Sequence, residues 1–412
     1  MSLTEFEAVP ALAETAVPKS GTVVMKFGGT SVADPERVVA VARRLARARD
    51  AGGRVVGVLS AMGGTTDELL ELAHEVSPRP HERELDLLVS VGERVSCALA
   101  AMALIELGYD AVSLTGSQAG IVTDTAHGKA KIVEVRSTRI NAALDRGAIV
   151  LVAGFQGVST DSEVTTLGRG GSDTTAVALA ASLGADECAI YTDVPGVFTA
   201  DPRLVRDARQ LHALTFDEML ELAASGARVL QLRSVEFARN HGVVLHVRSS
   251  FSDDEGTWIT SEEDVRVLEK AMISGIAHTV DETVYRVTGA SNATLFAALA
   301  DTHVNVDTIL QSGPEIVFSA PSEDDVTTRR VLDELGTTWS ADSELGKVSV
   351  VGAGMKSHPG VAATTFMTLQ ANGIEVEIVT TSPIKIACHI PRQDVERAVV
   401  ALHDAFGLGA SG

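Results

Sequence analysis

The strongest constraint on this chain is an alternation of strand-like and helix-like segments between residues 22 and 251. Runs rich in β-branched residues, such as TVVMKF and AIVLVAGF, alternate with helical stretches such as DPERVVAVARRLARARDAG. In that stretch Asp34 is placed to cap the first helical turn and Pro35 to occupy its first position. Alternating strands and helices form a mainly parallel sheet with helices on both faces. We therefore predict an open α/β sheet within three α/β/α layers.

The pattern predicts further elements in this region. RVVGVLS and CAIYTDV are expected strands, and TDELLELAHEV and the Ala-rich residues 174–183 are expected helices. The segment ELDLLVSVGERVSCALAAMALIELG is either one long buried helix or a kinked pair of helices.

The composition changes near Thr257, and the rest of the chain contains an internal repeat. VTGASNATLFAAL and VNVDTI align with VVGAGMKSHPGVAATTFMTL and IEVEIV, which predicts two small α+β units of a kind more typical of regulation or dimerisation than of catalysis. We expect a flexible arm over residues 1–20, a catalytic domain over 21–256, a linker over 257–270 and the tandem units over 271–412. The first unit spans about 283–340 and is either followed by the second, about 345–412, or inserted in it.

The charge balance narrows the classes of partner. The 34 Lys and Arg residues face 55 Asp and Glu residues, giving a formal charge of -21, which disfavours nucleic acid and anionic membranes. The first twenty residues lack the basic and apolar regions of a secretory signal, and no run of 18 apolar residues occurs. We expect a cytoplasmic protein without a membrane span.

Three cysteines, Cys97, Cys188 and Cys388, lie far apart in apolar surroundings, which predicts buried thiols in a reducing compartment. Neither CxxC nor HExxH spacing occurs, so no metal bound by protein ligands is expected.

A Gly-Gly pair followed by a hydroxyl residue occurs three times, each time before a predicted helix: at residues 28–30, 63–65 and 170–172. In an open parallel sheet such turns lie at the carboxyl edge, where ligands bind. Glycine lets backbone N–H groups approach phosphate oxygens. Lys26 ends the first strand and could place its ammonium over those oxygens, although a lone lysine at a strand end is usually solvated.

Arg169 stands beside two of these glycines, at the start of the helix in TTLGRGGSDTTAVALAASLGA. A cation is mildly unfavourable at the positive end of a helix dipole, so an arginine there indicates a nearby anion. GxxxxGK[ST] loops and the GxGxxG motif with HRD or DFG partners are missing. Any nucleotide must therefore bind in another way.

Seven motifs, taken in order, resemble the aspartokinases. They are KFGGTSVAD, SAMGGTTDELLEL, SVGERVS, TGSQAGIVTD, AGFQG, TTLGRGGSDTTAVALA and YTDVPGVFTADPR, and the resemblance runs from about residue 22 to 412. It implies an amino acid kinase fold followed by two ferredoxin-like ACT domains. The implied reaction is phosphorylation of the β-carboxylate of L-aspartate by ATP, with Mg²⁺ carried by the nucleotide. A carboxylate is already ionised at neutral pH, so catalysis needs positioning and charge stabilisation rather than a strong base.

The resemblance assigns roles residue by residue. Lys26 and Asp173 match catalytic residues, Arg169 matches the group that pairs with a substrate carboxylate, and Glu93 matches the group that takes the substrate ammonium. The alternative interpretations are that Asp173 only caps a helix and that Glu93 is a carboxylate on a helix surface. The other aspartate contacts implied are Ser60, Thr66, Phe155, Gly170, Gly171 and Ser172. The ATP contacts implied, besides Lys26, are Phe27, Gly28, Gly29, Thr30, Ser31, Thr192, Asp193, Phe198, Thr199, Ala200, Asp201, Pro202, Arg203 and Arg228; an ordinary turn is the alternative for residues 198–203.

The chain departs from the family pattern at two places. Arg228 stands where relatives usually carry a lysine near ATP, which keeps the charge but not the shape. The first ACT loop is GASNA, residues 289–293, without the acid and proline of the family's effector loop. The second loop is full, and its candidate effector residues are Met355, Lys356, Ser357, His358, Pro359, Gly360 and Val361.

We therefore expect feedback by lysine or threonine to be weakened or lost, the alternative being that the short unit still dimerises and one effector still binds. A related kinase acting on another substrate and an amino-acid-sensing subunit are the alternative functions. A homodimer through the ACT units and a heterotetramer with a short ACT-only chain are both open.

Overall fold

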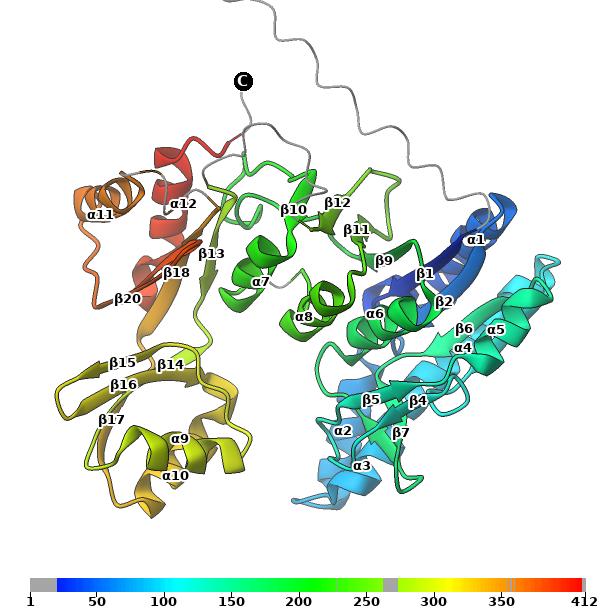
Figure 1. Ribbon diagram of the computed structural model, residues 1–412, viewed down its shortest axis with the longest axis horizontal. Helices are drawn as coiled ribbons and strands as arrows, with labels where there is room; N and C mark the ends of the chain where they lie inside the picture. Colours follow the sequence, from blue (N-terminus) through cyan, green and yellow to red (C-terminus); the bar gives the residue numbers. More distant parts are fainter. Residues whose placement is uncertain are drawn as a thin grey trace, which may run out of the picture. The chain divides into compact units, whose positions relative to one another are not determined.

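The computed structural model describes residues 21–227, 229–261, 273–353, 355, 358 and 360–409. The chain forms two compact units (Figure 1). Unit 1 contains residues 1–196 and 229–264, and unit 2 contains residues 197–228 and 265–412.

The main sheet of unit 1 is parallel, as the alternating pattern predicts. Its strands run in the order β12-β11-β9-β1-β2-β6-β3, and only β12 is antiparallel to its neighbour in this series. In the register, Lys26 lies between Val58 and Ile190. The bounds are β1 (Thr22–Phe27), β2 (Arg54–Leu59), β3 (Ala111–Leu114), β6 (Ile149–Ala153), β9 (Glu187–Thr192), β11 (Leu245–Ser249) and β12 (Thr257–Thr260).

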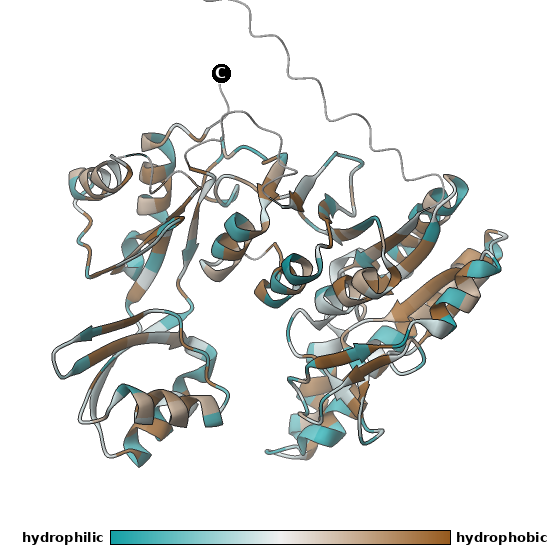
Figure 2. Cartoon of the chain, viewed as in Figure 1, coloured by the Kyte–Doolittle hydropathy of each residue, from teal (hydrophilic) through white to brown (hydrophobic). Residues whose placement is uncertain are grey.

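Helices cover both faces of this sheet. Odd residues of β1, such as Met25 and Phe27, belong to the core formed with α1 (Pro35–Asp50) and α4 (Val91–Glu106). The opposite face packs against α6 (Gly171–Leu183), beside which lies α8 (Leu232–His241). Figure 2 shows β6 largely in brown, whereas α8 alternates between teal and brown. Asp34 caps α1 by accepting a hydrogen bond from the Arg37 N–H at 2.9 Å, as predicted. The remaining helices of this unit are η1 (Gly29–Val32), α2 (Thr65–Val76), α3 (Glu82–Val89) and α5 (Thr138–Asp145).

The kinked-pair reading of residues 84–108 is the one that the structure bears out, because α3 and α4 meet at Ser90. The segment Glu82–Glu106 is long and apolar enough to meet the length and composition of a membrane span, and half of its most apolar window is buried within the protein. The outer face of α4 exposes Val95, Leu99 and Met102. Composition of this kind is also found in core helices of soluble proteins, so it is weak evidence for a span.

A second, smaller sheet in unit 1 was not anticipated from the sequence. It has the order β5-β4-β7-β8. Its strands are β4 (Ile121–Thr123), β5 (Ile132–Val135), β7 (Gln156–Ser159) and β8 (Val164–Thr166).

Unit 2 contains the two predicted repeats as two four-stranded modules. The first has sheet order β15-β16-β14-β17 and the second has order β13-β18-β20-β19. Because β13 precedes the first module in the chain, the first module is inserted in the second. The elements are β13 (Gly275–Thr279), β14 (Glu282–Thr288), α9 (Asn292–Asp301), β15 (Ile309–Ser312), β16 (Glu315–Pro321), η2 (Ser322–Asp324), α10 (Asp325–Glu334), β17 (Thr338–Asp342), β18 (Leu345–Val351), α11 (Val361–Ala371), β19 (Ile378–Ser382), β20 (Lys385–Pro391), η3 (Arg392–Asp394) and α12 (Val395–Ala405).

Residues 197–228, which we expected in the catalytic domain, pack in unit 2. They carry β10 (Ala213–Thr215) and α7 (Phe216–Ala224), and their Ala200 and Val205 join the core of the second module. On α7, Glu218 accepts a hydrogen bond from the hydroxyl of Ser274 at 2.7 Å. The expected linker also begins with a strand, β12, and its residues 262–270 lie outside the described part.

Candidate active site

The loops that follow parallel strands meet at the carboxyl edge of the main sheet. The Gly28 N–H donates to the Tyr191 carbonyl at 3.2 Å, and the Gly63 N–H donates to the Gly29 carbonyl at 3.1 Å. A Cβ at Gly29 would lie 3.0 Å from the Ala61 carbonyl oxygen, so the approach of these two loops requires a residue without a side chain. The first two Gly-Gly turns are therefore neighbours, at the edge where ligands of open α/β sheets bind.

Lys26 and Asp173 form an ion pair at this edge. The Nζ–Oδ1 distance is 2.5 Å, and the two side chains are only 11% and 8% exposed. Oδ1 of Asp173 makes no directed hydrogen bond within the described residues, so the contact is one of opposite charges. Gly28 keeps the space beside the ammonium open, since a Cβ there would lie 3.7 Å from Nζ. The pair joins the end of β1 to the first turn of α6.

Glu93 is a buried carboxyl with one open oxygen. It is 3% exposed, and its Oε1 accepts a hydrogen bond from the Ala61 N–H at 3.2 Å. Its Oε2 has no hydrogen-bond partner among the described residues. Burial raises the pKa of Glu93 to about 7. The surface-carboxylate reading of Glu93 is therefore wrong, and the open oxygen is suited to a cationic group.

The entry to α6 brings together other predicted substrate residues. Phe155 has a positive φ of 68°, and a Cβ at Gly171 would lie 3.0 Å from its ring. Ser172 is buried against Gly154, whose added Cβ would lie 2.7 Å from the serine hydroxyl oxygen. Gly170, the residue before α6, is left-handed with φ 70°. Arg169 is exposed on this loop.

Ser60 and Thr66 lie at the end of β2 and in the first turn of α2. The Ser60 N–H donates to the Phe27 carbonyl at 3.1 Å, and the Ser60 carbonyl accepts from the hydroxyl of Ser96 at 2.7 Å. Thr66 is half-buried. All of the predicted aspartate-contacting residues thus belong to unit 1.

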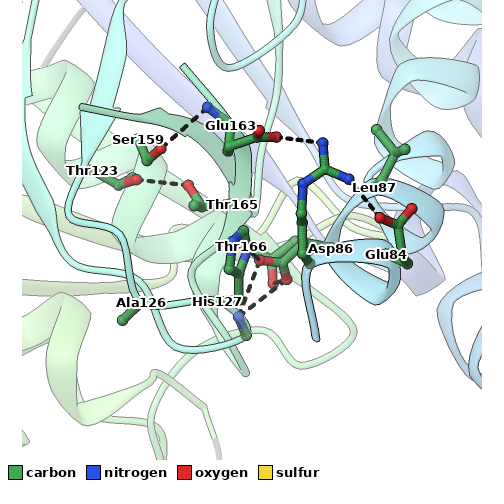
Figure 3. Close-up of polar contacts among 12 residues, drawn as sticks. Glu84, Asp86, Leu87, Thr123, Ala126, His127, Ser159, Glu163, Thr165 and Thr166 are labelled. Atoms are coloured by element: carbon green, nitrogen blue, oxygen red, sulfur yellow. Dashed lines mark hydrogen bonds and ion pairs between the residues drawn. The ribbon is translucent and has the colours of Figure 1, made fainter. Parts of the chain in front are cut away.

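A buried carboxylate that sequence reasoning missed holds this region from α3 (Figure 3). Asp86 is 1% exposed, and both its oxygens accept from the Gly128 N–H at 3.1 Å. It also contacts His127 Nδ1 at 2.7 Å and accepts a hydrogen bond from the Thr166 hydroxyl. In ELDLL, Asp86 has the appearance of an ordinary helix carboxylate, so no local pattern indicates this role.

Arg233 also holds the backbone near Thr166 and Gly128 in place. Its guanidinium donates to the carbonyls of Leu167 and Ala130 at 3.0 and 2.9 Å. Burial lowers the pKa of Arg233 from its ordinary value. Asp86 and Arg233 therefore fix the backbone immediately before Arg169.

The predicted nucleotide residues are divided between the two units. Phe27 to Ser31, Thr192 and Asp193 belong to unit 1, whereas Phe198 to Arg203 belong to unit 2, and Arg228 lies outside the described residues. Thr199 is 1% exposed, and its hydroxyl lies 3.0 Å from His403 Nε2, so its side chain has a structural role in unit 2. Arg203 pairs with Asp201 at 2.6 Å, and this hydrogen bonding lowers the pKa of Asp201.

The candidate effector loop is described only in part. Val361 is buried at the start of α11, Met355 packs against the core of the second module, and Gly360 has φ 125°. His358 is exposed, whereas Lys356, Ser357 and Pro359 lie outside the described residues. The three cysteines are buried free thiols, as predicted. Burial raises the pKa of each, in Cys388 to about 11, so none is a ready thiolate.

The chain itself is similar to known families. The amino acid kinase family matches residues 21–249, and an ACT domain matches residues 348–406. The chain therefore belongs to the amino acid kinase family.

The relatives at higher identity give its place within that family. The aspartokinase of Mycobacterium tuberculosis is 50% identical over 405 residues, covering 94% of this chain and 96% of the relative. The aspartokinase of Geobacillus stearothermophilus is 51% identical over 94% of this chain and 98% of the relative. A crystal structure of E. coli aspartokinase III in complex with aspartate and ADP matches with a TM-score of 0.83 at 25% identity, covering 93% of this chain and 99% of that one. The chain is accordingly an aspartokinase.

Proposed function

We propose that the chain transfers the γ-phosphoryl group of ATP to the β-carboxylate of L-aspartate, giving 4-phospho-L-aspartate, at the carboxyl edge of the main sheet. The observation that carries the proposal is the buried pair of Lys26 and Asp173 beside the glycine turn. A solved E. coli relative binds aspartate and ADP. The names of the relatives favour aspartate over another carboxylate substrate, and the retained kinase part argues against a sensing subunit.

Each residue has a physical task in this proposal. Lys26, oriented by Asp173, neutralises phosphate oxygens that also contact the backbone N–H group of Gly29, since the Gly28 N–H already donates to Tyr191. Glu93 accepts the substrate ammonium through its open oxygen, and Arg169 binds a substrate carboxylate with two parallel hydrogen bonds. Mg²⁺ carried by ATP would supply further neutralisation of the phosphate charge. An oxygen of the aspartate carboxylate then attacks the γ-phosphorus in line, without a general base, as the bond to the β-phosphate oxygen breaks and ADP leaves.

Substitutions of the two cations test the assignment. We expect Lys26→Ala to lower kcat by about 100-fold to 1,000-fold, because one preorganised donor to the transferring group is lost. We expect Arg169→Ala to act mainly through the KM for aspartate, raising it by at least about 10-fold. Aspartate-dependent ADP formation in a coupled assay measures both, and Arg139→Ala, an exposed arginine on α5, is the matched control.

The same assay separates the alternatives. Equal activity with another amino acid or with carbamate would favour a related kinase, and amino-acid binding without any turnover would favour a sensing subunit. Loss of activity in the Arg139 control to the same degree would remove the support for both proposed roles.

We further propose that feedback by lysine or threonine is weakened or lost. In the first module only residues 289–291 connect β14 to α9, whereas residues 352–360 connect β18 to α11 in the second. Ser291 caps α9 through the Thr294 N–H at 3.2 Å, and Asn292 donates to Gln311 at 2.8 Å, so the short loop is satisfied by its own contacts. Assays with lysine, threonine and both together test this. Strong inhibition by the pair at micromolar concentration would contradict it.

We also propose that the ACT modules mediate assembly of the protein. The ACT modules make a homodimer or a heterotetramer with a short ACT-only chain the two candidate assemblies. The mass of the purified chain by light scattering, alone and mixed with an ACT-only chain, distinguishes them.

A further inference from the structure

We propose that unit 2 carries a binding site for a divalent first-row transition-metal ion, formed by His403 with Asp207 and Asp404. His403 lies in the last turns of α12, a helix labelled in Figure 1, and Asp207 belongs to the segment 197–228 of the same unit. One imidazole nitrogen and one oxygen from each carboxylate lie within 4.8 Å of one another. Nothing in the proposed kinase reaction uses these three residues.

The buried imidazole has its second nitrogen without a partner. The side chain of His403 is 0% exposed, and its Nδ1 makes no hydrogen bond to any residue in the described part of the chain. Nδ1 lies 4.0 Å from Oδ1 of Asp207 and 4.0 Å from Oδ1 of Asp404. These distances are too long for hydrogen bonds. A buried polar atom of this kind usually has a partner, so its absence requires an explanation.

The contacts of the other ring nitrogen, Nε2, determine the tautomer of His403. The Thr199 hydroxyl oxygen lies 3.0 Å from His403 Nε2 and 3.3 Å from the Leu408 carbonyl, and it accepts the Arg209 N–H at 2.9 Å. All of these contacts are satisfied together only if Nε2 carries the proton and donates to Thr199, while the threonine hydroxyl donates to Leu408. In the neutral imidazole, Nδ1 then presents a lone pair to two carboxylates. These three electron-rich atoms repel one another, and a cation bound between them would offset that repulsion.

The arrangement fits a metal ion. Metal-bound histidines usually donate their other N–H to an oxygen, as His403 does to Thr199. With metal–ligand distances of about 2.1 Å, ligand atoms lie about 3 to 4 Å apart. The two carboxylates are 59% and 67% exposed, so they can make the small movement needed and leave further positions to water. Asp207 fits closely against Gly409, where an added Cβ would lie 2.3 Å from Oδ2.

The donor set indicates the kind of ion. One imidazole with two carboxylates suits Zn²⁺, Mn²⁺ and their neighbours, whereas Mg²⁺ and Ca²⁺ prefer oxygen alone. Arg209 is a nearby cation that acts on His403, and the two carboxylates outweigh its charge. An ion bound here would join residue 207 to α12 and would stabilise the packing of segment 197–228 within unit 2.

Titration of metal-free protein with Zn²⁺ or Mn²⁺, in the absence of nucleotide, tests the proposal. We expect the parent chain to bind Zn²⁺ with one more tight site per chain than Asp404→Asn or Asp207→Asn, whose affinity at this site falls by at least about 10-fold. The Tm should rise with Zn²⁺ in the parent and not in these variants. Asp301→Asn, an exposed carboxylate on α9, is the matched control.

The two Asp variants change exposed side chains and should fold, whereas His403→Gln removes a buried group and serves only as a third measurement. Unchanged Zn²⁺ stoichiometry and affinity in both Asp variants would overturn the proposal. Equal weakening in Asp301→Asn would overturn it as well, because the effect would then come from net charge. Kinase activity is not part of the readout, so the result stands apart from the proposed reaction.

Discussion

A single buried carboxyl, Glu93, ties the chemistry of this chain to its stability. The pKa of Glu93 rises from 4.5 to about 7 because the group is buried. The native state therefore holds a proton between these values that the unfolded state has released, so stability falls as pH rises from about 4.5 to about 7. Above that range the charged, unpaired group opposes folding. An ammonium from a substrate would offset the cost.

We predict that Glu93→Gln raises the stability of unit 1 at pH 8 by a few kcal/mol, since each pKa unit corresponds to about 1.4 kcal/mol. The amide oxygen can still accept the Ala61 N–H, and the charge is gone. At pH 5 the gain should be much smaller. Urea unfolding of both proteins at the two pH values measures this, and an equal gain at pH 5 and pH 8 would show that burial of the charge is not the cause. Activity should fall in the same variant.

At the scale of an element, the start of α6 depends on a residue that has no side chain. Gly170 is left-handed, and an added Cβ would lie 1.8 Å from the Gln231 side chain. Gly184 ends the same helix with φ 57° and has open space around it. The two positions share the same backbone strain and differ in their surroundings.

We predict that Gly184→Ala costs about 1 kcal/mol of stability, from the left-handed backbone alone, and leaves the KM for aspartate unchanged. Gly170→Ala should cost more, because Gln231 must move, and it should raise that KM by displacing Arg169. Thermal unfolding and steady-state kinetics of the two variants provide the comparison. Similar losses in both would mean that the contact with Gln231 is unimportant.

Asp86 acts on the same loops from α3. Replacing it with asparagine removes charge-assisted acceptors for Gly128, His127 and Thr166, and we predict a loss of about 2 kcal/mol or more. The KM for aspartate should rise as well, because the chain before Arg169 loosens. Glu84→Gln, an exposed carboxylate on the same helix, should change stability by less than about 1 kcal/mol. Unfolding midpoints and the KM for aspartate of the two variants test this prediction. Equal effects of the Asp86 and Glu84 substitutions would show that Asp86 does not hold these loops in place.

These cases show which features of the structure could be predicted from the sequence and which could not. Period and capping predicted β1, α1 and β2 closely, because Asp34 and Pro35 act within a few residues of themselves. Asp86 could not be recognised, since its partners lie about 40 and 80 residues away. Glu93 was a candidate only through the family resemblance, and its burial could not be predicted, because that depends on where α4 packs. Local pattern predicts elements, but the environment of a charge depends on tertiary packing.

For the whole molecule, the unexpected finding is the membership of residues 197–228 in unit 2. Strand pattern alone assigned them to the catalytic domain, and it could not show which core Ala200 and Val205 would join. The segment is held there by polar contacts as well. Glu221 on α7 pairs with Lys385 on β20 at 2.9 Å, and both side chains are largely buried.

A chain cut after residue 261 tests this membership. It would keep residues 197–228 but remove Ser274, Lys385 and His403, so the segment would lose both its apolar core and its buried polar partners. We predict that amide hydrogens of residues 197–228 then exchange at the rate of an unfolded chain, whereas those of β1 and β2, which pair with each other in unit 1, stay protected. Hydrogen exchange read by mass spectrometry on the cut and the full chain makes the comparison. Protection of 197–228 in the cut chain would mean that unit 1 alone can hold the segment, and a domain border near residue 256 would then be the correct one.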